Sequence, residues 1–173
     1  MENQTNSKSI ILNYGLYLAL VGIFIHLILY ATGTLLDYTW VTGVIGFVAM
    51  IAFIILGIKK YKTNNGGYLS FGEALKVGVG IAVVSAVISI IYTLIFTNFI
   101  DPSFQEQAME LQKQKWLDGG MSEEQIDASV EMAKKFQNPA ITSAVSIVVQ
   151  AFFGFIISAI GGAIMKKTEE NEY

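Results

Sequence analysis

A run of twenty residues without a charged side chain, from Val77 to Phe96, most constrains how this chain folds. A helix over this run is about 30 Å long at about 1.5 Å per residue, which matches the hydrocarbon thickness of a bilayer. Just before it, Ser70 and Glu73 have the S-x-x-E spacing of a capping box, in which each side chain accepts a hydrogen bond from the other residue's backbone amide. The sequence therefore predicts a membrane-spanning helix that begins at a defined cap.

Three other runs, residues 10–32, 40–58 and 141–165, are also apolar and long enough to span a bilayer. The first is longer than the apolar core of a cleaved signal peptide, which has about 7–15 residues, so we expect it to remain as a helix. The composition, 53% hydrophobic and 14% charged, departs from that of soluble proteins in the same direction. We therefore predict an all-α polytopic membrane protein, a single membrane domain over residues 1–173 with four spans, the third over residues 77–96.

The connection between the third and fourth spans, residues 100–138, is polar and has helix signals of its own. Asp101 is expected to cap a helix with Pro102 at its first position, where proline is favoured, and a glycine pair ends that helix. Ser122 and Gln125 have the spacing of a second capping box. These signals predict a helical hairpin outside the membrane, whose apolar faces pack together or lie against the membrane surface.

The distribution of charge predicts the orientation of the chain. In a four-span arrangement, one side receives Asp37 and the insert, residues 100–138, which has four lysines and eight acidic residues. The lysines of the other connections and of the chain ends all fall on the opposite side: Lys8, Lys59, Lys60, Lys62, Lys76, Lys166 and Lys167. The positive-inside rule then predicts that both termini are cytoplasmic and that the insert lies outside the cell membrane.

The residue types that are missing exclude several kinds of chemistry. The chain has no cysteine, so disulfides and thiolate sites are excluded. All 11 basic residues are lysines, and without the bidentate phosphate contacts of arginine we do not expect nucleic-acid binding. A single histidine supplies neither a base and nucleophile pair nor a set of metal ligands. We therefore expect neither an enzyme nor a bound cofactor or metal.

Four polar side chains inside the spans form the candidate site: His26, Ser89, Tyr92 and Gln150. Ionisable groups within a bilayer are costly, and His26 shares a face with small residues, so it is expected to point into the bundle. The helical rise places all four side chains at overlapping depths, about 8–14 Å from one end of the spans. We hypothesise an intramembrane polar cluster, with a neutral histidine that merely hydrogen-bonds a neighbouring helix as the alternative.

Three motifs in a fixed order resemble a known family. The sequence GYLSFGEALKVG at residues 67–78 is followed by IDPSF at residues 100–104 and by GMSEEQI at residues 120–126. In this order they resemble the bacterial membrane family called domain of unknown function 4199. The resemblance covers nearly the whole chain and implies four transmembrane helices in a bacterial inner membrane. It implies no activity and no site residues.

Two functions from different classes fit these observations. The first is a non-enzymatic membrane protein whose hairpin binds a protein partner or the membrane surface, because the hairpin is the largest soluble element and has no catalytic groups. The alternative is transport or permeation of a small solute through the helix bundle, although the spans lack the carboxylates and arginines that usually couple transport.

Small residues recur at every fourth position of the third and fourth spans, a pattern that lets helix backbones approach closely. We interpret these stripes as packing surfaces within one subunit, with self-association into an oligomer as the alternative. The stripes consist of Gly78, Ala82 and Ala86 in the third span and of Gly154, Ser158 and Gly162 in the fourth.

Overall fold

The computed structural model describes residues 7–136 and 138–167. These residues form long helices joined by short connections, together with a helical hairpin. In chain order the elements are α1 (Ser7–Ala31), α2 (Thr39–Asn64), α3 (Phe71–Ile95), the π-helix η1 (Phe96–Ile100), α4 (Phe104–Asp118), α5 (Glu123–Phe136) and α6 (Pro139–Met165).

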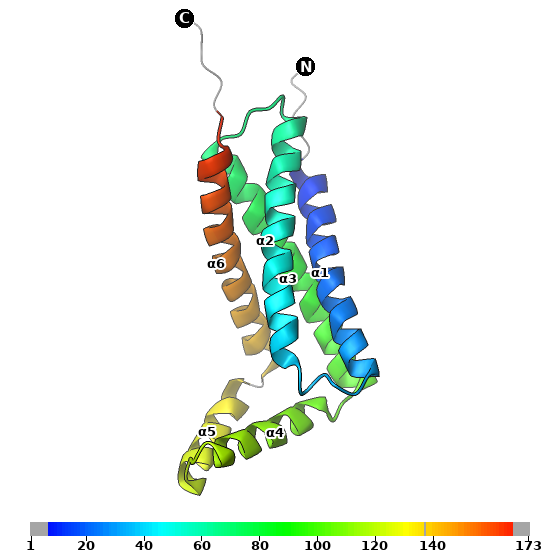
Figure 1. The fold of residues 1–173 in the computed structure, drawn as a ribbon, viewed down its shortest axis with the longest axis vertical. Helices are drawn as coiled ribbons and strands as arrows, with labels where there is room; N and C mark the ends of the chain where they lie inside the picture. Colours follow the sequence, from blue (N-terminus) through cyan, green and yellow to red (C-terminus); the bar gives the residue numbers. More distant parts are fainter. Residues whose placement is uncertain (1–6, 137, 168–173) are drawn as a thin grey trace, which may run out of the picture.

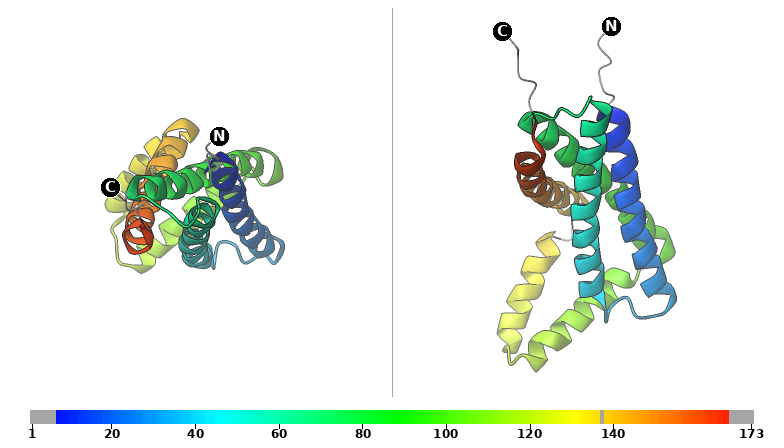
Figure 2. Two further views of the ribbon diagram at one scale, coloured as in Figure 1. Left: turned by 90° about the horizontal axis from the view of Figure 1, so that it is seen from above. Right: turned by 45° about the horizontal axis from the view of Figure 1, so that its top comes forward.

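Helices α1, α2, α3 and α6 form an antiparallel bundle, and each is long and apolar enough to cross a membrane. Helix α1 begins and α6 ends at the same end of the bundle, whereas the hairpin of α4 and α5 lies beyond the opposite end (Figures 1 and 2). The predicted all-α fold, with four spans and a hairpin between the third and the fourth, is confirmed. The chain is a multi-pass membrane protein.

The long helices extend past the apolar runs, chiefly at the end of the bundle away from the hairpin. Helix α2 continues to Asn64 although its apolar run ends at Ile58, and α3 begins at Phe71, six residues before Val77. The added turns carry the polar and lysine side chains of these helices. An apolar run ends at the membrane surface, whereas a helix continues until its backbone groups are capped.

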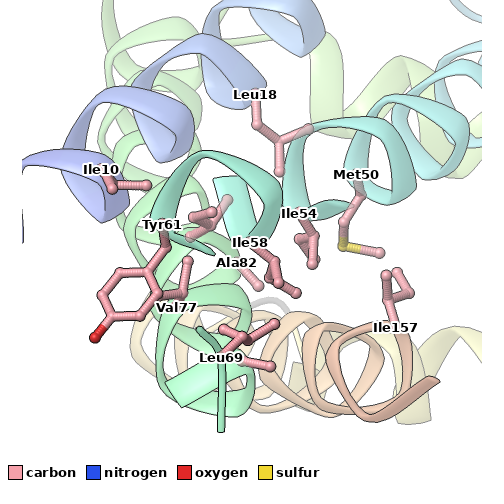
Figure 3. Close-up of a cluster of buried hydrophobic side chains, with 12 residues drawn as sticks. Ile10, Leu18, Met50, Ile54, Ile58, Tyr61, Leu69, Val77, Ala82 and Ile157 are labelled. Atoms are coloured by element: carbon pink, nitrogen blue, oxygen red, sulfur yellow. The ribbon is translucent and has the colours of Figure 1, made fainter. Parts of the chain in front are cut away.

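Helix α3 packs against each of the other three long helices, most extensively against α6 and α1. Its Val77 and Ile81 are completely buried, as are Ile54 and Ile58 of α2. Figure 3 shows this core, to which Ile10 of α1 and several other apolar side chains also contribute. The buried side chains of α3 lie toward the other helices, whereas Val87 and Ile91 of the same helix are exposed, so α3 keeps one face on the surface of the bundle.

The small-residue stripes of α3 and α6 lie at the contact between these two helices within one chain. A Cβ atom added to Gly154 would lie 2.6 Å from the Cβ of Ala82, and one added to Gly162 would lie 2.7 Å from the Cβ of Ala74. The hydroxyl of Ser158 is buried and donates to the carbonyl oxygen of Gly154. Close approach of α3 and α6 therefore depends on the absence of these methyl groups.

We expect Gly154→Ala to destabilise the bundle, because the new methyl group meets a Cβ atom that no rotamer change can move. Overpacking of this kind costs about 1–3 kcal/mol, which lowers the thermal midpoint by roughly 2–4 °C per kcal/mol in a chain of this size. The matched control is Gly46→Ala, where nothing lies within 4 Å, so the gain in helix propensity leaves stability unchanged or higher. Thermal unfolding in detergent measures both variants, and equal midpoints would contradict the close α3–α6 contact.

Both capping boxes are present. The Ser70 hydroxyl accepts from the Glu73 amide at 3.2 Å, and the Glu73 carboxylate accepts from the Ser70 amide at 2.7 Å. The same carboxylate also accepts from the hydroxyl of Tyr61 at 2.9 Å, which ties the start of α3 to the end of α2. At α5, Ser122 and Gln125 make the equivalent pair of bonds, at 3.0 and 3.4 Å.

A small set of contacts joins the α2–α3 loop to the end of α6. Leu69 and Lys167 exchange two backbone hydrogen bonds of 2.9 Å, forming an isolated antiparallel bridge. The ammonium group of Lys62 donates to the carbonyl oxygen of Met165 at 2.7 Å, which satisfies one of the last carbonyl groups of α6. These contacts close the bundle at the end away from the hairpin.

The start of the hairpin differs from the expectation. We predicted that Asp101 caps a helix with Pro102 at its first position, but α4 begins at Phe104 with Ser103 as its N-cap. The Asp101 carboxylate instead accepts from the amide of Ser103 at 3.1 Å and from its hydroxyl at 2.7 Å. Asp101 therefore closes a turn before the helix, a local alternative that aspartate side chains favour.

Candidate functional site

The one histidine of the chain is paired with a tyrosine of another helix. His26 of α1 places its Nδ1 2.8 Å from the hydroxyl of Tyr92 of α3. With the neutral imidazole protonated at Nε2, the tyrosine hydroxyl donates this hydrogen bond. His26 lies five residues before the end of α1 and Tyr92 three residues before the end of α3, so the bond joins the two helices in the half of the bundle where α3 leads toward the hairpin.

Aromatic rings surround this pair and extend it to the hairpin. The His26 ring meets Phe96 edge to face, with centroids 4.6 Å apart, and Phe104 of α4 at 6.2 Å. Phe96 is only 1% exposed and also contacts Tyr30 at 5.0 Å and Phe104 at 5.4 Å. We call this group the aromatic junction; it comprises His26, Tyr30, Tyr92, Phe96 and Phe104.

The aromatic junction lies where the third span changes from an α-helix to a π-helix. Phe96 is the first residue of η1, and its carbonyl oxygen accepts from the amide of Asp101 at 2.8 Å, a bond across five residues. Short π-helical segments are frequent at functional sites. Because each π-turn holds more residues than an α-turn, η1 changes the direction in which the chain leaves the bundle toward Phe104.

Two of the four predicted site residues, His26 and Tyr92, are joined by a hydrogen bond. Ser89 and Gln150 are half-buried, and within residues 7–136 and 138–167 no hydrogen bond links either side chain to His26 or Tyr92. Gln150 belongs to α6, which packs against α2 and α3, while α1 packs against other faces of those helices (Figure 2). We predicted the cluster from matching depths, and depth does not specify the direction in which a side chain points from its helix.

Sequence reasoning missed Phe96 and Phe104 as partners of His26. The sequence places Phe104 in the predicted hairpin and Phe96 at the end of the third predicted span, without indicating that either ring meets His26. No local pattern distinguishes an aromatic residue that packs on a distant helix from one that faces lipid. The cluster of aromatic side chains near one interface was the one available signal, and it is equally typical of the aromatic belt of a membrane protein.

A cavity lies beside the aromatic junction, between the hairpin-side ends of α3 and α6. Its volume is about 210 Å³, and no charged side chain is among the residues that line it. The lining residues are Ile90, Thr93, Leu94, Thr97, Asn98, Gln105, Pro139, Thr142, Ser143 and Ser146. We call this cavity the hydroxyl groove, since three threonines and two serines contribute to its wall.

The chemistry of these features is that of packing and neutral hydrogen bonding. In the part of the chain that the structure describes, no three or more histidine, aspartate or glutamate side chains are grouped so that they could hold a metal ion. The aromatic junction connects α1, α3 and α4 through ring contacts and one hydrogen bond. The aromatic junction is therefore one contact between the membrane bundle and the hairpin, beside the contact of α5 with α6.

One of three comparisons with known proteins found a match. No match was found among curated proteins, and none among solved structures. The sequence model of a family described as a protein of unknown function, DUF4199, matches residues 13–167, which include α2, α3, α6, the hairpin and α1 from residue 13 onward. The family predicted from the order of the motifs is therefore confirmed, and the chain belongs to this family, DUF4199.

Proposed function

We propose that this protein is a non-enzymatic membrane protein whose hairpin binds a protein partner. The observation that supports the proposal most is an apolar surface on the hairpin that neither helix covers. A shallow cavity of about 430 Å³ lies between α4 and α5, and Met132 on its wall is 64% exposed. Its other lining residues are Trp116, Ala128, Ser129 and Ala133.

The buried apolar side chains of the hairpin are distinct from this surface. Ile126 and Val130 of α5 are buried and form the apolar face that holds the hairpin together. Trp116 and Met132 lie outside that buried face, yet they are large apolar side chains of a kind enriched in the cores of protein interfaces. Exposed apolar surface of this kind, rimmed by polar residues, is typical of interaction sites.

The charge of the hairpin favours a protein partner over a lipid surface. The insert at residues 100–138 has four lysines against eight acidic residues, a net charge of −4. Anionic headgroups repel such a surface, whereas membrane-binding segments are usually rich in lysine and arginine. The partner that fits best offers an apolar anchor for the cavity beside Trp116 and a basic rim around it. The distribution of lysines favours a partner outside the cell membrane.

Site-directed crosslinking in intact cells tests this proposal, because the chain has no native cysteine. A photoreactive thiol reagent on Met132→Cys is expected to give one discrete crosslinked product. The same reagent on Glu124→Cys, which is exposed and outside the cavity, is expected to give none.

A second substitution separates specific binding from random capture. Trp116→Ala is expected to abolish the Met132→Cys product, because an aromatic anchor contributes about 2 kcal/mol or more to an interface. Leu117→Ala, the neighbouring exposed residue that does not line the cavity, is expected to leave the product unchanged. Crosslinks to lipid alone, or equal products from all four variants, would overturn the proposal.

A further inference from the structure

We propose that the hydroxyl groove binds the glycerol and ester region of one phospholipid from the membrane leaflet on the hairpin side. The groove has one wall suited to an apolar chain and another suited to hydrogen bonding. Ile90 and Leu94 of α3 form the apolar part, whereas Ser143 and Ser146 of α6 supply hydroxyl groups. A lipid combines the same two chemistries within one molecule. This inference is independent of the function proposed for the hairpin.

The position of the groove matches the depth of the lipid backbone. It extends from Pro139, at the start of α6, to Ser146, seven residues further along, or about 10 Å at 1.5 Å per residue. A bilayer has about 30 Å of hydrocarbon within about 40–45 Å in total, so each interfacial layer is roughly 5–7 Å thick. The groove therefore extends from the interfacial layer into the upper part of the hydrocarbon.

The serine hydroxyls need a partner from outside the chain. Ser143 and Ser146 are half-buried, and within the described ranges neither hydroxyl makes a hydrogen bond to the protein. The threonines of α3 differ, because Thr93 and Thr97 donate to backbone carbonyl groups one turn earlier. An unpaired hydroxyl at this depth is costly, and the ester carbonyls of a lipid are acceptors at the same depth.

The lining selects the chemical class of the ligand. None of the ten lining residues is charged, so the groove offers no ion pair to a phosphate or an ammonium group. The amide of Gln105, from α4, makes no hydrogen bond within the part of the chain that is described, and it stands at the mouth of the groove nearest the hairpin. Recognition should therefore depend on the glycerol and ester region and be nearly independent of the headgroup.

The surroundings of the groove also favour a lipid over a free polyol. The apolar side chains beside it on both helices, including Ile91 and Val145, are exposed on the surface of the bundle, where a membrane protein meets acyl chains. The volume of about 210 Å³ is below the roughly 300–1,000 Å³ of sites that enclose a whole ligand. The groove is therefore expected to hold one segment of a larger molecule whose remainder lies in the bilayer.

Native mass spectrometry of the full chain in mild detergent tests the proposal, with phosphatidylglycerol, phosphatidylethanolamine or phosphatidylcholine added separately. We expect one retained lipid per chain at similar occupancy for all three headgroups. Ser146→Leu fills the groove and is expected to reduce occupancy at least about tenfold, which corresponds to about 1.4 kcal/mol of binding energy. Val148→Leu, on the exposed lipid-facing surface, is the matched control and is expected to retain the lipid.

A second variant controls for misfolding. A measurement in glycerol then distinguishes a bound lipid from a soluble polyol, because both contain a glycerol unit. The double change Ser143→Ala and Ser146→Ala removes the hydroxyls without adding volume, and it is expected to weaken lipid retention while the helical circular dichroism spectrum stays unchanged. Equal retention by wild type and both variants would overturn the proposal. If glycerol raises the thermal midpoint of the wild type but not of the Ser146 variants, and no lipid is retained, the groove binds a soluble polyol. That result would also overturn the proposal.

Discussion

Phe96→Ala is expected to destabilise the protein more than any other single substitution considered for this chain. Phe96 is 1% exposed and contacts the rings of His26, Tyr30 and Phe104, which belong to α1 and α4. Removing a fully buried phenylalanine ring costs about 3–5 kcal/mol, because the contacts are lost and a cavity remains. The loss should appear both in thermal unfolding and in the docking of the hairpin.

The matched control stands three residues away in the same π-helix. Phe99 is 82% exposed, so Phe99→Ala is expected to change the thermal midpoint little. Hydrogen–deuterium exchange of α4 distinguishes the two roles, since only Phe96→Ala should accelerate exchange at the start of this helix, where Phe104 loses its contact with the bundle. Equal effects of the two substitutions would mean that the aromatic junction does not hold the hairpin.

Cysteine labelling is expected to give an all-or-none result for orientation. In intact cells, a membrane-impermeant maleimide should label Ser122→Cys at the hairpin and should not label Thr63→Cys at the lysine-rich end of α2. Both positions are exposed in the structure, so access to the reagent depends on the side of the membrane rather than on burial. The expectation follows from the positive-inside rule applied to the lysines of the connections.

Permeabilised cells provide the control for this experiment, because both cysteines should then react. Labelling of Thr63→Cys alone in intact cells would invert the orientation and place the hairpin in the cytosol. The search for a partner would then move to cytosolic proteins, and the charge distribution would have been a poor guide for this chain.

Much of the fold follows from signals that are local in the sequence. The S-x-x-E spacing of Ser70 and Glu73 produces the capping box because both bonds join residues three positions apart. The spans follow from the length of each apolar run, and the hairpin follows from a polar insert with its own caps. Asp101 shows the limit of such signals, because aspartate closes a turn as readily as it caps a helix.

The candidate site was only partly accessible to the same reasoning. His26 and Tyr92 were placed together through their depth in the bilayer, and the structure joins them at 2.8 Å. Gln150 has a similar expected depth, but it lies on α6, which packs mainly against α2 and α3 rather than against α1, the helix of His26. Depth depends on position along a helix axis, whereas contact also depends on the rotation of each helix about that axis.

The sequence by itself therefore determined the number of spans, the hairpin between the third and the fourth, and both capping boxes, because these depend on apolar run length and on short-range hydrogen bonds. Only the tertiary structure decided that the third span ends in a π-helix, that Phe104 of the hairpin packs on His26 of the bundle, and that a groove lined with hydroxyls separates α3 from α6 at that end. The physical reason is that helix rotation, ring packing and cavities depend on contacts between residues far apart in the chain.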